Sequence, residues 1–252
     1  ETTAALLVDA FATEPAGGLP VAVLPEGEDL TDDQLRRAAD EFAATVAVPS
    51  EGYDSLRVVG PDGETTALVA AFALAREHEE LSAGEYGVAT PTGDRAVTVD
   101  EDGRTWVDLP HRASDVDEGL AVDEEQIAGA LGVDVAALRD VGGDLPPARI
   151  PGPVDTLAVG VNFLEHLGGL SPDRGAMTAL ADVAAVDAVC AFTFDTLAAE
   201  STIHARTFLP GAAGDPRATG IEVPVTPQIA GTCVDHLVGR GTVENDSPTV
   251  EQ

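Results

Sequence analysis

The chain has 252 residues and a formal net charge of −32, because 45 Asp and Glu side chains stand against 13 basic ones. All 13 basic residues are Arg, and Lys does not occur. An acid surplus of this size repels phosphates and anionic lipid headgroups, so it disfavours nucleic-acid binding and membrane binding. Disorder is also disfavoured, because the mean hydropathy is slightly positive, at +0.07, and apolar runs recur along the chain.

The length fits one large domain or two domains of about 100–150 residues. The most apolar stretch, 66–75, is about half of the roughly 18–20 residues that a membrane span needs. The chain begins without a basic segment of the kind that opens a secretion signal, so we expect a cytoplasmic protein. Two cysteines, Cys190 and Cys233, form neither a disulfide framework nor a metal motif.

The charge predicts the solvent rather than the activity. Self-repulsion at −32 opposes the compact state at ordinary ionic strength. At about 1 M salt the Debye length is roughly 3 Å, and this repulsion is mostly screened. The absence of Lys, with 41 Ala and 29 Val in the chain, therefore favours a haloarchaeal-type protein from a cytoplasm with molar salt. The alternative is an acidic protein of a mesophile.

The first half of the chain alternates strand-like and helical segments. Thr31 and Gln34 have capping-box spacing before a helix predicted over 32–44. Residues 66–77 are apolar on all sides until Arg76 and Glu77, which predicts a helix buried in the middle of a domain. Strands are predicted at 4–11, 21–24, 46–48, 56–59, 96–100 and 105–109.

A polar, acidic stretch at 111–119 indicates a boundary between two domains, 1–114 and 115–252. Each half then holds several strands and one strongly apolar helix, which favours an α+β protein with two similar lobes. In the second half we predict helices at 123–131, 134–140, 172–183 and 228–238, strands at 156–161, 186–194 and 203–209, and a glycine-rich loop at 211–220.

Four segments carry a resemblance to a known family. Residues 7–24, with Asp-Ala-Phe, a short turn and Gly-Gly-Leu-Pro-Val-Ala-Val, resemble the opening of the phenazine-biosynthesis PhzF-like family. The predicted helix at 34–42 matches the next helix of the family, and 157–194 fits in order and spacing. Three short runs near the C-terminus, Phe208-Leu209-Pro210, Gly214-Asp215-Pro216 and Thr219-Gly220, resemble one further segment of the family. That segment reads Phe-x-Pro…Glu-Asp-Pro-Val-Thr-Gly-Ser.

The resemblance implies a diaminopimelate-epimerase-like fold, in which two pseudo-symmetric lobes each wrap a mixed sheet around a central helix. Family members with an assigned reaction are isomerases or epimerases of small acids that use no cofactor. The implied mechanism is acid–base proton transfer in a cleft between the lobes, with helix N-termini holding the carboxylate of a small acidic metabolite. The resemblance also implies a homodimer.

The chain departs from the family at most of the polar site positions. Val46 stands where the family has its catalytic Glu, and Val46 has no group that takes up a proton. Glu64-Thr65 replaces a Gly-His pair at the start of the first central helix, and Ile221 replaces a Ser. Of the four polar groups, only Asp215 remains. Because a general acid–base contributes about 10²–10⁴ in rate, we expect the family reaction to be abolished or severely impaired.

Each of the remaining candidate residues can have a structural role instead of a functional one. Asp215 is either the surviving acid–base group or an Asp that caps a helix from a Gly/Pro turn. Cys190 and Cys233 are either core thiols or a two-thiol epimerase pair, and their apolar surroundings favour the core. The five His are scattered without zinc-like spacing, so no metal is expected. The candidate substrate-binding residues are Gly18, Thr65, Gly214, Thr219 and Gly220, and the last three form either an anion-binding turn or a loop without ligand.

Two functions therefore stay open. The first is an isomerase or epimerase of a small carboxylic acid, with Asp215 and partners still to be identified. The second is a non-catalytic relative that binds a small metabolite or serves as an interaction protein. The residue at position 46 favours the second, and the family resemblance favours the first.

Overall fold

The computed structural model describes residues 3–12, 18–60, 63–108, 116–141, 145–152, 154–199, 201–210, 222–223, 225–243, 248 and 250–251. The chain divides into two compact units, Glu1–Pro110 and His111–Gln252. The predicted boundary between residues 114 and 115 lies outside the described residues. Among the residues described, no helix is long and apolar enough to cross a membrane.

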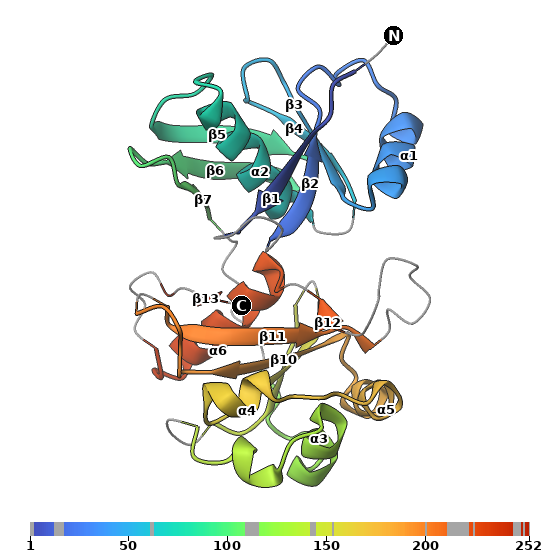
Figure 1. Ribbon diagram of the computed structural model, residues 1–252, viewed down its shortest axis with the longest axis vertical. Helices are drawn as coiled ribbons and strands as arrows, with labels where there is room; N and C mark the ends of the chain where they lie inside the picture. Colours follow the sequence, from blue (N-terminus) through green and yellow to red (C-terminus); the bar gives the residue numbers. More distant parts are fainter. Residues whose placement is uncertain are drawn as a thin grey trace. The chain divides into compact units, whose positions relative to one another are not determined.

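The first unit places one apolar helix against a mixed sheet and a three-stranded sheet (Figure 1). The mixed sheet has the order β1-β2-β3-β4, in which only β2 and β3 run parallel. The second sheet is the antiparallel meander β5-β6-β7. The elements are β1 (Leu6–Ala10), β2 (Leu19–Val23), α1 (Asp32–Phe42), β3 (Thr45–Pro49), β4 (Leu56–Val59), α2 (Gly63–Glu77), β5 (Gly84–Thr90), β6 (Gly93–Val99) and β7 (Thr105–Val107).

The helix α2 is the core of the first unit. Its residues from Thr65 to Phe72 are all buried, and it packs against β1, β2, β3, β4 and β7. The outer face of β2 and β3 is covered instead by α1, which the predicted capping box begins. The Thr31 hydroxyl accepts from the Gln34 N–H at 3.4 Å, and the Thr31 N–H donates to the Gln34 side chain at 2.8 Å. The predicted helix and its cap are therefore confirmed.

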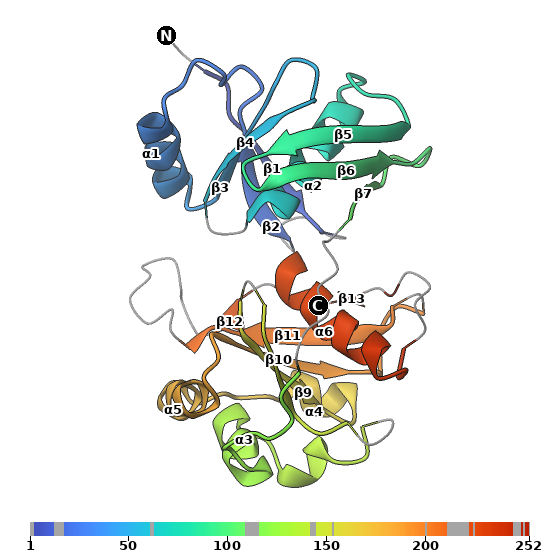
Figure 2. The same cartoon turned by 180° about the vertical axis from the view of Figure 1, so that it is seen from behind.

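The second unit is a six-stranded sheet between two helical layers. The strand order is β12-β11-β10-β9-β8, and β13 pairs with β11. Figures 1 and 2 show α3, α4 and α5 on one side of this sheet and α6 on the other. The elements are α3 (Glu124–Leu131), the 3₁₀ helix η1 (Val135–Leu138), β8 (Ala148–Ile150), β9 (Thr156–Gly160), α4 (Leu164–Gly168), α5 (Arg174–Ala184), β10 (Ala188–Thr193), β11 (Ile203–Phe208), β12 (Glu222–Val223), α6 (Pro227–Gly239) and β13 (Val250–Glu251).

The α+β class and the apolar helix packed on a sheet in each unit are confirmed. Five elements, β5, β8, α4, β12 and β13, have no counterpart in the sequence prediction. The helix predicted at 134–140 is a single 3₁₀ turn, η1, capped by Asp134 through the Ala136 N–H at 2.9 Å. Asp123 caps α3 with a second capping box that the sequence analysis did not identify.

Candidate functional site

Val46 lies in the middle of an apolar cluster beneath α1. On β3 it pairs with Ala22 of β2 and Val59 of β4, and its side chain is wholly buried. The same cluster holds Leu35 and Ala39 of α1. A one-residue shift of the alignment would not supply an acid, because Thr45 and Ala47 are the neighbours on β3. Strand β3 therefore offers no proton-carrying carboxyl group.

Gly18 has a packing reason to be glycine. It precedes β2 and lies against the end of β1, where a Cβ atom would come within 2.3 Å of the Ala10 carbonyl oxygen. Any larger residue would push the two strands apart at this point. The structure thus explains Gly18 without a ligand, and its predicted role in substrate binding remains a prediction.

Glu64, in the first turn of α2, has its carboxylate bonded within the first unit. One oxygen accepts from the Thr92 N–H at 2.9 Å, and the other accepts from the hydroxyls of Thr90 at 2.7 Å and Thr92 at 2.5 Å. Arg95 lies 3.9 Å from that second oxygen and donates to the Thr92 hydroxyl at 2.8 Å. The side chain of Glu64 is 13% exposed. Its charge therefore holds the turn between β5 and β6 against the beginning of α2.

This arrangement gives the start of α2 an electrostatic character opposite to that implied by the family. A helix N-terminus attracts anions through its free N–H groups and its dipole. Here a fixed carboxylate of the chain itself occupies the first turn, and Thr65 beside it is buried. An incoming carboxylate would meet a like charge at short range. The predicted site residue Thr65 and its neighbour Glu64 thus both belong to the packed first unit.

In the second unit, the candidate residues Gly214, Asp215, Thr219, Gly220 and Ile221 lie outside the described residues. The structure does describe the strands on either side of them. Phe208 of β11 pairs with Glu222 of β12. Arg206 joins the same strands, because its Nε and Nη2 donate to the two Glu222 carboxylate oxygens at 2.7 Å each.

Arg206 is the most extensively bonded side chain near this part of the chain. Besides the bonds to Glu222, its Nη1 donates to the Leu167 carbonyl at the end of α4 at 2.8 Å, and its guanidinium lies 5.5 Å from the centre of the Phe208 ring. Hydrogen bonding to Arg206 lowers the pKa of Glu222 from its ordinary value. Sequence reasoning missed this pair, because no local pattern connects two residues that meet only through strand pairing.

The cysteines are core thiols of one unit. Cys190 on β10 and Cys233 on α6 are both wholly buried in the cluster between the sheet and α6. They therefore do not form a two-thiol pair with one sulfur in each lobe. His236, on the same helix, is also buried, and burial lowers its pKa. Within the described ranges, no group of three or more His, Cys, Asp or Glu side chains is placed to hold a metal ion.

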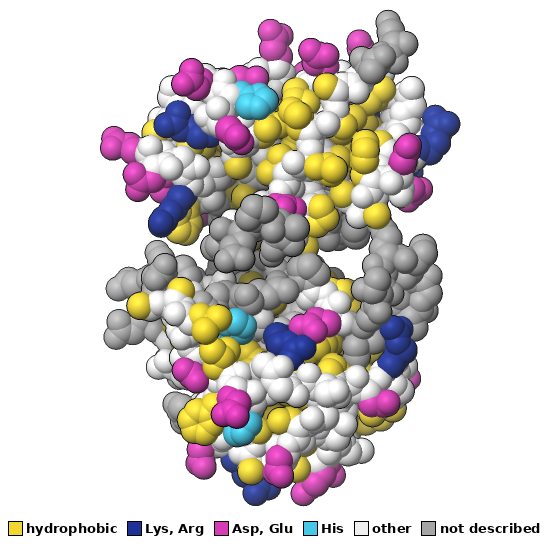
Figure 3. All heavy atoms as spheres, viewed as in Figure 1, with side chains coloured by type: hydrophobic (Ala, Val, Ile, Leu, Met, Phe, Trp, Pro, Cys, Tyr) yellow, Lys and Arg dark blue, Asp and Glu magenta, His cyan; other side chains and the backbone are white. Residues whose placement is uncertain are grey.

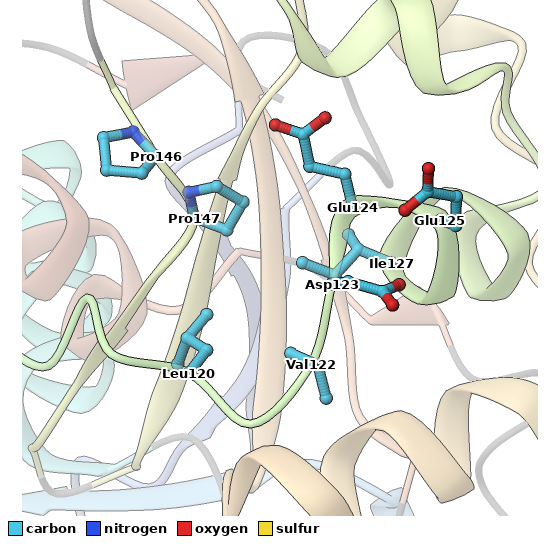
Figure 4. A pocket seen from close by; sticks show the side chains of 8 residues that line it. All are labelled: Leu120, Val122, Asp123, Glu124, Glu125, Ile127, Pro146 and Pro147. Carbon is cyan, nitrogen blue, oxygen red and sulfur yellow. The ribbon is translucent and has the colours of Figure 1, made fainter.

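The second unit has a hollow of about 410 Å³ beside the beginning of α3. Figure 4 shows Pro146, Pro147 and Leu120 on one side of it and the acidic side chains of the α3 N-terminus on the other. Asp123 caps α3, and Glu124 forms an ion pair with Arg139 at 3.0 Å. Both acids thus have structural roles, and the acidic wall disfavours a carboxylate ligand.

Comparison with known proteins identifies the class to which these features belong. The model of the PhzC-PhzF family, described as phenazine biosynthesis-like protein, matches residues 8–246. The chain therefore belongs to the PhzC-PhzF family.

Its relatives agree with this assignment. The protein named "Uncharacterized isomerase YfhB" of Bacillus subtilis (strain 168) is 28% identical over 257 residues, with 98% of this chain and 85% of that protein covered. A PhzF-family phenazine biosynthesis protein of Bacillus anthracis superposes with a TM-score of 0.76 at 22% identity, over 94% of this chain and 81% of the other. A PhzF-family protein of Enterococcus faecalis gives 0.72 at 19% identity, over 96% and 84%. The fold expected from the resemblance is thus confirmed.

Proposed function

We propose that this protein binds a small carboxylic acid as a PhzF-like isomerase or epimerase whose cofactor-free acid–base reaction is severely impaired. The burial of Val46 under α1 carries the proposal. A proton shuttle needs a titratable group within hydrogen-bond reach of the substrate. Position 46 instead holds an aliphatic side chain packed among Ala22, Leu35 and Ala39.

The bonding of Glu64 supports the same conclusion. It is the acid nearest in sequence to the family's Gly-His position, so it is the obvious substitute for a lost acid–base group. Its carboxylate already accepts three hydrogen bonds from Thr90 and Thr92. Taking up or releasing a proton there would disturb the turn that it stabilises. Asp215 is the remaining candidate for acid–base catalysis, with Gly214, Thr219 and Gly220 as candidate substrate contacts.

The alternative function is a non-catalytic protein of the same fold that binds a small acidic metabolite or another protein. The observation that favours it is again Glu64, because a carboxylate that is already bonded to Thr90 and Thr92 at the start of α2 is not free to transfer a proton. The two functions differ in one measurable property. An impaired isomerase exchanges the substrate's carbon-bound proton slowly, whereas a binder does not exchange it at all.

Deuterium wash-in tests the proposal. The full chain in molar KCl and D₂O is incubated with single amino acids and 2-hydroxy acids, and the carbon-bound deuterium is measured by NMR. We expect slow exchange with at least one acid, lost in Asp215→Asn and retained in the control Asp182→Asn, whose side chain is exposed on α5. Calorimetry with the same acids reports binding separately.

Each outcome has a defined meaning. Exchange at rates typical of enzymes, dependent on Asp215, overturns the proposed impairment. Binding without exchange supports the alternative function. If neither binding nor exchange is observed, the proposal that the ligand is a small acid is contradicted. We also propose a homodimer in the cytoplasm, which the family resemblance supports and which sedimentation analysis at several salt concentrations tests.

A further inference from the structure

Two thiols meet in the core of the second unit. Cys190 lies in the middle of β10 and Cys233 in the middle of α6, and both have no exposed surface. They belong to the same apolar cluster, which also contains Ile203, Ile229 and Leu237. The chain has two cysteines in total, so this pair has no other cysteine of the same chain with which to react.

The sheet beneath α6 presents small side chains around the pair. Cys190 is paired with Ala158 on β9 and with Thr207 on β11, and directly paired residues point to the same face of a sheet. Thr207 is wholly buried, and its hydroxyl has no hydrogen-bond partner among the described residues. An unpartnered donor in an apolar core is rare, and here it lies beside a sulfur atom.

The protonation state of Cys233 explains why its thiol is unreactive at rest. A hydrogen bond to Cys190, together with burial, raises the pKa of the Cys233 thiol. Thiolates are the reactive form of cysteine, so the Cys233 thiol stays protonated and unreactive while α6 is in place. A disulfide would be neutral as well, so forming it would leave no charge in the apolar core.

We propose that Cys190 and Cys233 form an oxidative modification site, at which a small peroxide produces an intramolecular disulfide between β10 and α6. One sulfur attacks the peroxide and becomes a sulfenic acid, while the other peroxide oxygen leaves as water or an alcohol. The second thiol then displaces the sulfenic oxygen as water, and the S–S bond forms. The two thiols together lose two electrons and two hydrogens, and the peroxide gains them. The free hydroxyl of Thr207 is placed to donate to the sulfenic oxygen.

The disulfide would close the segment from Cys190 to Cys233 into a loop. This segment contains β11, β12 and the candidate residues between them. Cross-linking a segment of this length restricts the unfolded chain, and we expect the Tm to rise by about 10 °C. Because the thiols are buried, the reaction requires a brief opening of α6 and should be slower than the oxidation of an exposed thiol.

Intact-protein mass spectrometry tests the site. The folded chain in molar KCl is treated with hydrogen peroxide, unfolded in the presence of iodoacetamide, and weighed. We expect the untreated protein to take up two carbamidomethyl groups and the oxidised protein to take up none. Peptide mapping without reductant should recover Cys190 linked to Cys233, and dithiothreitol should reverse both changes and the shift in Tm.

Single variants control for other effects of peroxide. Cys190→Ser and Cys233→Ser should each keep one alkylatable thiol and show no peroxide-induced rise in Tm, and the mass measurement on the unmodified chain stays decisive if a variant folds poorly. Thr207→Val should slow disulfide formation without changing its product. The proposal is overturned if both thiols remain alkylatable after peroxide, if each sulfur is oxidised separately, or if the product is a disulfide-linked dimer. The test is independent of any isomerase activity.

Discussion

Val46 and Arg206 illustrate two ways in which single residues determine the properties of this protein. Val46 is wholly buried beneath α1 among apolar side chains. Arg206 joins β11, β12 and the end of α4 through charged hydrogen bonds. The first bears on the proposed loss of acid–base chemistry, and the second on how the strands that flank the candidate residues 214–221 are held. Each role gives a prediction for substitution.

Placing a Glu at position 46, where the family resemblance implies one, should destabilise the protein. Val46→Glu places a carboxyl group among Ala22, Leu35 and Ala39 without a partner, which should cost about 3 kcal/mol or more of the unfolding free energy. Val46→Ala, which leaves only a small cavity, should cost about 2 kcal/mol. Urea unfolding in molar KCl measures both. A Val46→Glu variant as stable as the wild type would mean that the side chain reaches solvent, and would reopen position 46 as an acid–base site.

Loss of Arg206 should weaken the second unit. Arg206→Ala removes two bonds to Glu222 and one to the Leu167 carbonyl from a side chain that is 18% exposed, so we expect a loss of about 2 kcal/mol. Arg206→Lys should recover less than half of this, because an ammonium group lacks the planar fork. Arg36→Ala is the control, since its ion pair with Asp33 is mostly exposed and should contribute under about 0.5 kcal/mol. Equal losses at both positions would contradict the role of Arg206.

The same pair predicts a dependence of stability on pH. The pKa of Glu222 is lower in the folded protein than its ordinary value of 4.5. The unfolded chain therefore binds this proton more readily, and the contribution of Glu222 is complete above pH 4.5 and is lost as the pH falls toward the folded pKa. Above pH 4.5 we expect the unfolding free energies of the wild type and Glu222→Gln to differ by under about 1 kcal/mol, because Glu222 is partly exposed. This difference should shrink as the pH falls toward the folded pKa. A difference that does not change with pH would contradict the ion pair.

At the scale of elements, local patterns predicted the structure where one signal dominated. The capping box before α1 and the all-round apolar α2 were predicted because short-range spacing decides both. Strand β5 was missed because Gly84 and Gly87 interrupt it and only Val88 is buried, so alternation is weak. Strand β8 and helix α4 are too short to show a period.

In the candidate site, too, local patterns predicted some features and missed those that depend on strand pairing. Glu64 was placed correctly at the start of α2 from its position in sequence. Its partners Thr90 and Thr92 could not be anticipated, because they belong to a hairpin that was itself not predicted. Sequence reasoning therefore identified an acid at a helix N-terminus, whereas its hydrogen-bonding state came from pairing between β5 and β6.

The bonding of Glu64 predicts local mobility when it is removed. Glu64→Ala leaves the Thr92 N–H and the Thr92 hydroxyl without their acceptor, while the Thr90 hydroxyl keeps the Gly93 carbonyl at 2.6 Å, so we expect a cost of about 1–2 kcal/mol. Because the lost bonds hold the turn between β5 and β6, hydrogen exchange should accelerate at residues 90–93 before it accelerates elsewhere in the first unit. Glu85→Ala, an exposed acid on β5, is the matched control. Unchanged protection of the turn in Glu64→Ala would show that Glu64 does not hold it.

At the scale of the whole molecule, charge and burial are separated. Figure 3 shows acidic side chains spread over the visible surface of both units, while hydrophobic side chains gather over β1 and β2, where Leu7 is 66% exposed. The cores are built largely from Ala and Val, with few aromatic rings. Such a core buries less apolar area per residue, so the self-repulsion of the shell weighs more heavily against folding.

The stability of the protein should therefore rise strongly with salt, in two stages. Up to about 1 M KCl, screening of the −32 charge should raise the Tm steeply, because the Debye length falls from roughly 10 Å to 3 Å. Above that, potassium phosphate should stabilise further and KCl less so, because strongly excluded ions reinforce apolar burial. Calorimetric scans over this range measure both stages. Neutralising exposed acids together, as in a variant with Asp40→Asn, Glu41→Gln, Glu125→Gln and Asp182→Asn, should flatten the first stage and leave the second unchanged. A Tm that does not change with KCl would contradict the halophilic interpretation, because it would show that the folded protein tolerates its acidic surface without screening by salt.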